Sequence, residues 1–134
     1  MILIDTSAWI EYLRATGSPA AVEVRRVLTS EPNDVAMCEP VAMELLAGAS
    51  EDAQHTKLEA LVNGLPTLEI DATSDFRTAA AIYRSARRGG RTVRSITDCL
   101  IAAVAIRHEV TVIHRDADYD VIAAMTNLDA RSLR

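Results

Sequence analysis

Short apolar segments rich in isoleucine and valine alternate with longer segments of helical character, and this alternation constrains the fold most. The apolar segments that polar turns bound predict strands at Ile2–Asp5, Val35–Cys38, Thr67–Ile70 and Val110–His114. The other segments predict helices over Ser7–Arg14, Pro19–Leu28, Pro40–Ala49, Ala53–Val62, Ala72–Arg88, Ile96–His108 and Val121–Met125. Three of the strands are continuously apolar, as expected for parallel strands that are covered on both faces. The sequence therefore predicts an α/β sandwich with a mostly parallel central sheet.

Length and composition suit one globular domain. The chain has 134 residues, 49% hydrophobic and 25% charged, so we expect a single domain over residues 1–134. The first residues carry no basic leader and reach an acid at Asp5, so we expect no signal peptide. The longest apolar run, Cys99–Ile106, is far below the roughly 20 residues of a membrane span. We therefore expect a cytoplasmic protein with no membrane contact.

The net charge of the chain argues against a nucleic-acid partner, but the distribution of charge along the sequence weakens that argument. The net charge is −5, whereas phosphate binding normally needs a basic surface. However, residues 84–94 contain five arginines and no acid, which leaves −10 for the rest of the chain. This asymmetry indicates one edge that faces anions such as RNA, although a solvated helix end explains it equally well. The candidate RNA-binding residues are Arg84, Arg87, Arg88, Arg91 and Arg94.

Acids stand where two of the predicted strands end. In open α/β sheets, ligands bind beyond the carboxyl ends of the strands. Asp5 ends the first strand, and Asp116 and Asp118 follow the last one. Asp5 has a purely structural alternative, because an Asp in a strand-to-helix turn can accept backbone N–H bonds. Asp120 is interpreted as the solvated start of a helix.

Two further acids lie alone on apolar helices. Glu44 is the only polar residue between Pro40 and Gly48, which predicts a buried helix with a costly buried acid, unless Glu44 occupies a narrow solvent-facing strip. Asp98 is the only charge in the apolar segment that begins at Ile96. It lies three residues after Ser95, so the two can form a capping box, and capping and metal binding can coexist on one carboxylate.

If these four acids converge, the site needs cations. Two anions about 4 Å apart repel by on the order of 4 kcal/mol at an effective dielectric near 20. Oxygen ligands with no nearby cluster of cysteine or histidine favour Mg²⁺ or Mn²⁺ over zinc. One or two such ions can activate water and neutralise the charge of a phosphate during in-line displacement.

Four motifs, in order, carry a family resemblance. They are Asp5-Thr6-Ser7 after the opening strand, Glu44–Gly48, Asp98 at the start of a hydrophobic helix, and Arg115–Tyr119 after the next strand. This pattern resembles that of PIN-domain ribonucleases, and in spacing and length that of the VapC toxins of VapBC toxin–antitoxin pairs. The resemblance covers the whole chain. It implies a PIN-like three-layer sandwich and a Mg²⁺- or Mn²⁺-dependent endoribonuclease that cuts structured RNA, such as transfer RNA or a ribosomal RNA loop.

The resemblance also implies roles for individual residues. Asp5, Glu44, Asp98 and Asp116 match the catalytic, metal-binding set, and Asp118 matches a further acid of the last motif. Spacing does not decide whether Asp116 or Asp118 is the fourth ligand. Ser7 and Thr6 match hydroxyl positions that support the site through hydrogen bonds. The family further implies a homodimer and a small VapB-type antitoxin that threads a segment across the active site.

Two other classes of function compete with this interpretation. A haloacid-dehalogenase-like phosphotransferase also opens with an acid after its first strand. It needs a second acid where this chain has Ser7, and a lysine that Lys57, the only lysine, is poorly placed to supply. A non-catalytic PIN-fold module that binds proteins is the other alternative, and the four intact acids count against it.

Overall fold

The structure is a computed structural model that describes residues 1–134. Its strands are β1 (Ile2–Ile4), β2 (Val35–Ala36), β3 (Thr111–His114) and β4 (Asp129–Ser132). They form one sheet in the order β2-β1-β3-β4, and every neighbouring pair is parallel. In the centre of the sheet, Leu3 of β1 lies opposite Ala36 and Val112. The predicted α/β fold with a parallel sheet is confirmed.

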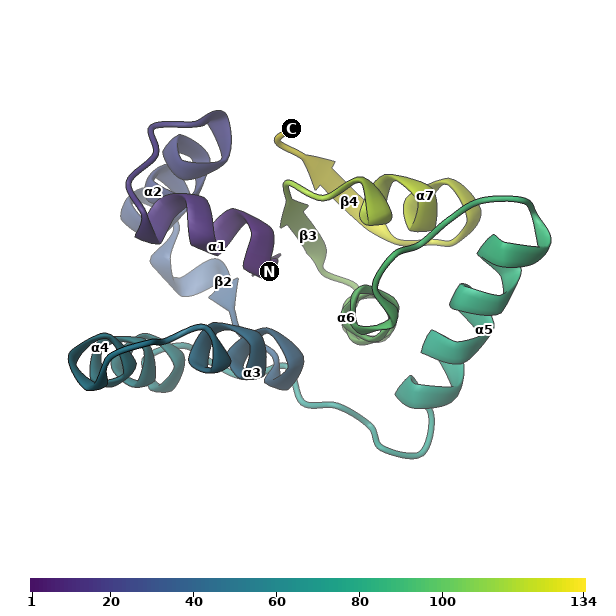
Figure 1. Cartoon of the computed structure of the whole chain (residues 1–134), viewed down its shortest axis with the longest axis horizontal. Coiled ribbons are helices and arrows are strands. Elements are labelled where there is room, and N and C mark those ends of the chain that lie inside the picture. The colour runs from purple at the N-terminus through teal and green to yellow at the C-terminus, as the bar shows by residue number, and fades with distance from the viewer.

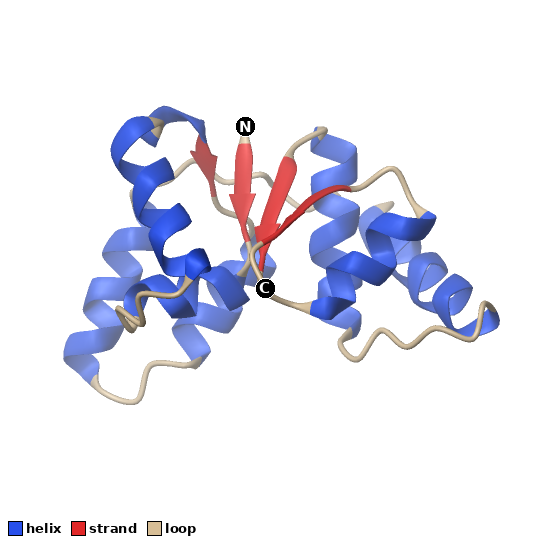
Figure 2. Cartoon of the chain, turned by 90° about the horizontal axis from the view of Figure 1, so that it is seen from above, coloured by secondary structure: helices blue, strands red, loops and turns tan.

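Helices flank this sheet on both sides, as Figures 1 and 2 show. They are α1 (Thr6–Leu13), α2 (Pro19–Ser30), α3 (Glu39–Ala47), α4 (Asp52–Asn63), α5 (Asp75–Arg88), α6 (Ile96–His108) and α7 (Ala117–Met125), with a 3₁₀ turn at Pro32–Asp34. Helices α1 to α4 gather on one side of the strands, and α5 to α7 on the other (Figure 1). None of the helices is long and apolar enough to cross a membrane.

The prediction of a strand at Thr67–Ile70 is wrong. Only Thr67 pairs in the manner of a strand, through a single parallel bridge to Met37, and Ile70 donates its N–H to the Glu39 carboxylate at 3.0 Å. The fourth strand is β4 instead, a polar and mostly exposed segment that was not predicted. Because β4 is an edge strand with β3 as its sole neighbour, it needs no apolar side chains and leaves no hydrophobic signal.

Helix α6 was predicted with its observed bounds, whereas α7 begins earlier than predicted. The Asp116 side chain accepts the N–H of Asp118 at 2.9 Å and caps α7, so the helix begins at Ala117 rather than Val121. Asp118 and Tyr119 thereby become helical residues of the first turn. Helix α5 begins at Asp75, three residues later than predicted.

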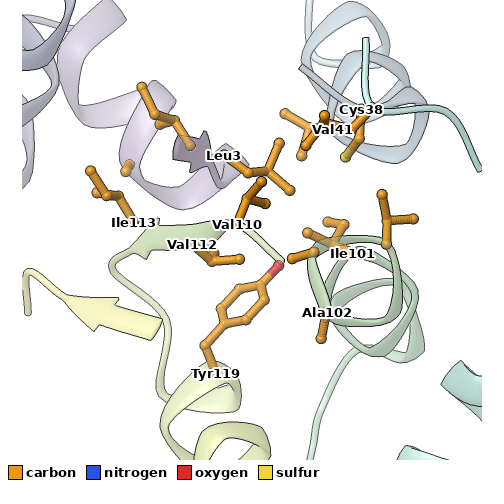
Figure 3. Packing of buried hydrophobic residues seen from close by; sticks show 14 of the residues in the cluster. Leu3, Cys38, Val41, Ile101, Ala102, Val110, Val112, Ile113 and Tyr119 are labelled. Carbon is orange, nitrogen blue, oxygen red and sulfur yellow. The ribbon is translucent and has the colours of Figure 1, made fainter. Parts of the chain in front are cut away.

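The core is built around α6. Helix α6 packs against α5, α7, α3 and β3, and its residues 101–105 are buried in one hydrophobic cluster (Figure 3). Helix α3 is less buried than predicted, because Met43 is 58% exposed and Ala47 also faces solvent. Glu44 lies between the buried and the exposed faces of α3 and is half-buried. The alternative of a solvent-facing strip on α3 is therefore correct for part of the helix.

Candidate active site

Asp5 lies at the carboxyl end of β1 and is 2% exposed. Its Oδ2 accepts hydrogen bonds from the Ser7 N–H at 2.9 Å and the Ser7 hydroxyl at 2.5 Å, so it caps α1 in the structural role that a strand-to-helix turn allows. The Ser7 hydroxyl in turn accepts the N–H of Arg115 at 2.9 Å. Ser7 therefore ties the end of β1 to the loop after β3. Capping uses only one oxygen of Asp5 and leaves Oδ1 for other contacts.

Asp98, Asp116 and Asp118 come together where the first turns of α6 and α7 meet. One carboxylate oxygen from each lies within 4.8 Å of the others, and Asp98 and Asp118 are 5% and 3% exposed. Asp118 accepts backbone N–H bonds from Arg94 and Ser95, both at 3.0 Å. These bonds fix the loop that precedes α6 against α7. Three acids from two helices thus share one small volume, as ligands of a cation would.

The Asp98 carboxyl has few structural contacts. Ser95 makes no side-chain capping bond, so the capping box considered from the sequence is absent. The Asp98 Oδ2 atom is buried without a hydrogen-bond partner. Burial first, and then the negative charges of the nearby Asp118, Asp5 and Asp116 carboxylates, raise the pKa of Asp98 to about 9. A buried oxygen without a partner is costly, and a cation is one way to satisfy it.

Tyr119 links two of the acids, a role that was not predicted from the sequence. Its hydroxyl donates to Asp5 Oδ1 at 2.6 Å and lies 3.4 Å from Asp98 Oδ1. Figure 3 shows its ring extending from α7 into the core between β3 and α6. Burial first, and then the charges of Asp5 and Asp98, raise the pKa of this phenol, which therefore stays protonated. The only sequence signal for Tyr119 was its place in the Arg115–Tyr119 motif, since no sequence rule predicts which distant groups one side chain contacts.

Glu44 approaches the acids from α3. Its Oε1 accepts the Thr6 hydroxyl at 2.8 Å, and burial together with the charges of Asp5 and Asp116 raises its pKa. The hydroxyls of Thr6 and Ser7 thus hold two different carboxylates. The structure therefore places three of the five predicted acids, Asp98, Asp116 and Asp118, within 4.8 Å of one another. Asp5 and Glu44 lie outside this cluster but close enough for their charges to interact with it.

His114 and Asp120 lie beside this group. His114 is fully buried, and its Nδ1 accepts the N–H of Asp116 at 3.2 Å. Burial lowers the pKa of His114, so the ring is neutral and steadies the Asp116 backbone. The Asp120 side chain is 42% exposed and pairs with Arg134 at 2.9 Å, and its Oδ1 also lies 3.6 Å from the buried His114 Nε2, so Asp120 is only partly the solvated helix start that was expected.

The donor set fits a hard divalent cation. The clustered ligands are all carboxylate oxygens, and no cysteine or histidine belongs to the group. The unpartnered Asp98 oxygen and the raised pKa of Asp98 indicate a site that has more negative charge than the surrounding protein groups neutralise. Asp98, Asp116 and Asp118 could therefore hold a metal ion.

The five arginines of residues 84–94 are all exposed. None of them forms a salt bridge, although Arg87 lies 5.7 Å from the ring centre of Tyr83. The segment is connected to the acids, because Arg94 donates its backbone N–H to Asp118. The structure leaves this segment free to bind an anionic partner.

A parallel α/β sheet with acids gathered at its carboxyl edge is the arrangement expected of a PIN domain. The family model for the PIN domain matches residues 2–125 of this chain. The chain is 68% identical over 134 residues to Ribonuclease VapC11 of Mycobacterium tuberculosis, with 100% of both chains covered. It belongs to the VapC family of PIN-domain ribonucleases, the toxins of VapBC toxin–antitoxin systems. Membership of this family removes the phosphotransferase alternative.

Solved structures share the fold at lower identity. VapBC2 from Rickettsia felis, bound to a DNA fragment from its promoter, has a TM-score of 0.76 at 16% identity, covering 100% of both chains. VapBC-1 from nontypeable Haemophilus influenzae has a TM-score of 0.75 at 20% identity, covering 99% of this chain and 98% of that one. These likenesses agree with the sheet order and helix arrangement described above.

Proposed function

We propose that the chain, as one PIN domain over residues 1–134, is a Mg²⁺- or Mn²⁺-dependent endoribonuclease that cuts structured RNA such as transfer RNA or a ribosomal RNA loop. The observation that carries the proposal is the meeting of Asp98, Asp116 and Asp118 beside an Asp98 oxygen that is buried without a partner. The proposal implies a cytoplasmic location, because such RNA is found there.

Each acid has a separate part in this proposal. When bound, a divalent ion would neutralise charge on the scissile phosphate and lower the pKa of an attacking water. Asp98 and Asp116 are its proposed ligands, with Asp5 and Glu44 completing the negative site. Thr6 holds Glu44 in place, and Tyr119 and Ser7 hold Asp5.

Asp116 is a better candidate than Asp118 for the fourth ligand. Both oxygens of Asp118 already accept backbone N–H bonds from residues 94 and 95. Asp116 uses only Oδ1, for the N–H of Asp118, and its other oxygen has no hydrogen bond. We therefore assign Asp116 to the metal and Asp118 chiefly to positioning the start of α6, with a weaker part in binding the ion.

The test is cleavage of total RNA by the purified protein with chelator, with Mg²⁺ and with Mn²⁺. We expect discrete cuts only with a divalent ion, and sequencing of the cut ends would name the RNA. Equal cleavage in chelator would contradict metal dependence. Tight RNA binding with no cleavage under any condition would instead support the non-catalytic binding module.

Two partners belong to the proposal as well. Solved structures of similar fold are VapBC complexes, so we propose a VapB-type antitoxin that covers the acids.

We also propose that the toxin is a homodimer. Light scattering on the purified chain should give twice the mass of 14.6 kDa, and a single-chain mass would contradict the dimer.

The exposed arginines are proposed contacts for RNA phosphates. Replacing Arg87, Arg88 and Arg91 with alanine should weaken RNA binding and flatten its dependence on salt. The slope should fall by about 0.7 for each single-strand phosphate that the variant no longer binds. The measurement is the RNA dissociation constant at several salt concentrations. Arg77→Ala, which removes another exposed arginine near the opposite end of α5, is the control. An unchanged slope in the triple variant would make these arginines a solvated helix end.

A further inference from the structure

A small hollow adjoins the carboxylates on the side of α3. It has a volume of about 130 Å³ and lies between α1, α3 and α4. Its walls are the aliphatic side chains of Ile10, Leu13, Leu45 and Leu58. At about 30 Å³ for each water, this volume corresponds to roughly four water molecules. The hollow is therefore of a size to take one planar ring and is too small for a helix.

Polar groups stand at the edge of these apolar walls. Glu44 lines the hollow and also interacts electrostatically with Asp5 and Asp116. The hollow and the candidate active site therefore share one residue. The Gln54 Oε1 atom accepts the N–H of Ser50 at 3.2 Å, which leaves the amide NH₂ as a free donor. Arg14 also lines the hollow, is exposed and forms no salt bridge.

We propose that this hollow binds the nucleobase of a nucleotide next to the scissile phosphate of the RNA. The inference rests on the proposed function, because it needs a phosphate at the carboxylates. A base and its phosphate are joined through one ribose, so a phosphate near Glu44 brings a base within reach of the hollow. Aliphatic walls can contact the faces of any base by burying its apolar surface, whereas a single amide donor such as Gln54 can bond to one edge. Arg14 supplies positive charge for a flanking phosphate.

Filling the hollow is the direct test, and Gly48 offers a way to do so. Gly48 lines the hollow at the end of α3 with an ordinary helical backbone, φ −78°. A Cβ at this position would meet only the carbonyl oxygens of Glu44 and Leu45, each at 3.5 Å, which is normal contact. Gly48→Leu should therefore fold, and because Gly48 lines the hollow we expect the leucine side chain to occupy part of it. Ala47→Leu adds a similar side chain one residue away on an exposed position outside the hollow, and is the matched control.

The readout is kcat/KM on a short RNA that contains the mapped cut site, and on the same RNA with an abasic nucleotide beside the cut. In the unaltered protein the abasic RNA should be cut about tenfold more slowly, because about 1.4 kcal/mol is a modest loss for a base that is buried against aliphatic side chains. Gly48→Leu should cut the intact RNA about tenfold more slowly, and the abasic change should then have no further effect. Ala47→Leu should match the unaltered protein on both RNAs. Gln54→Leu removes the amide donor, together with the exposed acceptor of the Ser50 N–H, and should change the preferred base beside the cut.

Several results would overturn this inference. Equal cleavage by Gly48→Leu and Ala47→Leu would do so, as would an abasic penalty that is the same with and without Gly48→Leu. If Gly48→Leu weakens inhibition by the cognate antitoxin but not RNA cleavage, the hollow holds a protein segment instead. If the unaltered protein cleaves both RNAs at equal rates, the hollow does not bind a base, but the proposed function still stands. No cleavage of either RNA with Mn²⁺ would reject the proposed function itself.

Discussion

Asp98→Asn is expected to lower RNA cleavage by at least roughly 100-fold, which is about 2.7 kcal/mol of barrier. Asparagine has almost the same shape as the protonated acid, and Asp98 is held with few structural bonds, so the fold should survive. The variant lacks the negative charge that a divalent ion requires. Asp5→Asn, Asp116→Asn and Glu44→Gln should each have an effect of the same order, measured as single-turnover cleavage with Mn²⁺.

Asp34→Asn is the matched control for these variants. It makes the same change on an exposed acid that precedes the amino end of β2, away from the carboxyl ends of the strands, and should leave cleavage within about twofold of the unaltered protein, as expected for a surface change. Near-full activity in Glu44→Gln would mean that Glu44 is a surface residue of α3 and no part of the site. If Asp34→Asn loses as much activity as Asp98→Asn, the effect is general electrostatics and the acids have no specific role.

The parts of the fold that hydrophobic patterning could predict are the buried ones. Helix α6 was predicted with its observed bounds because its residues are apolar around the whole circumference, as a central helix requires. The segment at Thr67–Ile70 buries only Leu68 and part of Ile70, and after one bridge at Thr67 it contacts Glu39 and Arg107 rather than continuing into the sheet. Patterning detects that a segment is buried and does not reveal which neighbour it pairs with.

The candidate site was predictable for a similar reason. A lone acid among apolar residues stands out in Glu44 and Asp98, and the rule of strand carboxyl ends points to Asp5 and Asp116. Two features could not be read from the chain. Tyr119 crosses between α7 and the acids only because α7 begins at Ala117, and that start depends on a cap made by Asp116. The difference between Asp116 and Asp118 arises from backbone N–H groups of another segment, which no local pattern encodes.

The second large effect concerns stability without metal. The pKa of Asp98 is raised to about 9, mainly by burial, from an ordinary value of 3.8. A raised pKa means that the folded protein holds a proton that the unfolded chain has released. The stabilising contribution of that proton is complete below about pH 4 and declines progressively as the pH rises towards 9. Asp98→Asn has no such proton to release, so it should lack this fall in stability.

In chelator, the advantage of Asp98→Asn over the unaltered protein in free energy of unfolding should therefore grow with pH. For one proton it can grow by up to about 1.4 kcal/mol per pH unit between pH 5 and pH 8. Comparing two proteins at each pH removes the contribution of groups that both share. Adding Mn²⁺ at pH 8 should reverse the order, because the ion stabilises only folded protein that binds it, and the unaltered site binds it better. If the metal-free Asp98→Asn protein instead unfolds more readily than the unaltered one at pH 8, the Asp98 carboxylate is a structural partner in its ionised form. The acids would then repel one another less than their proximity in this structure requires. Without that repulsion, the argument for a cation between them would no longer hold.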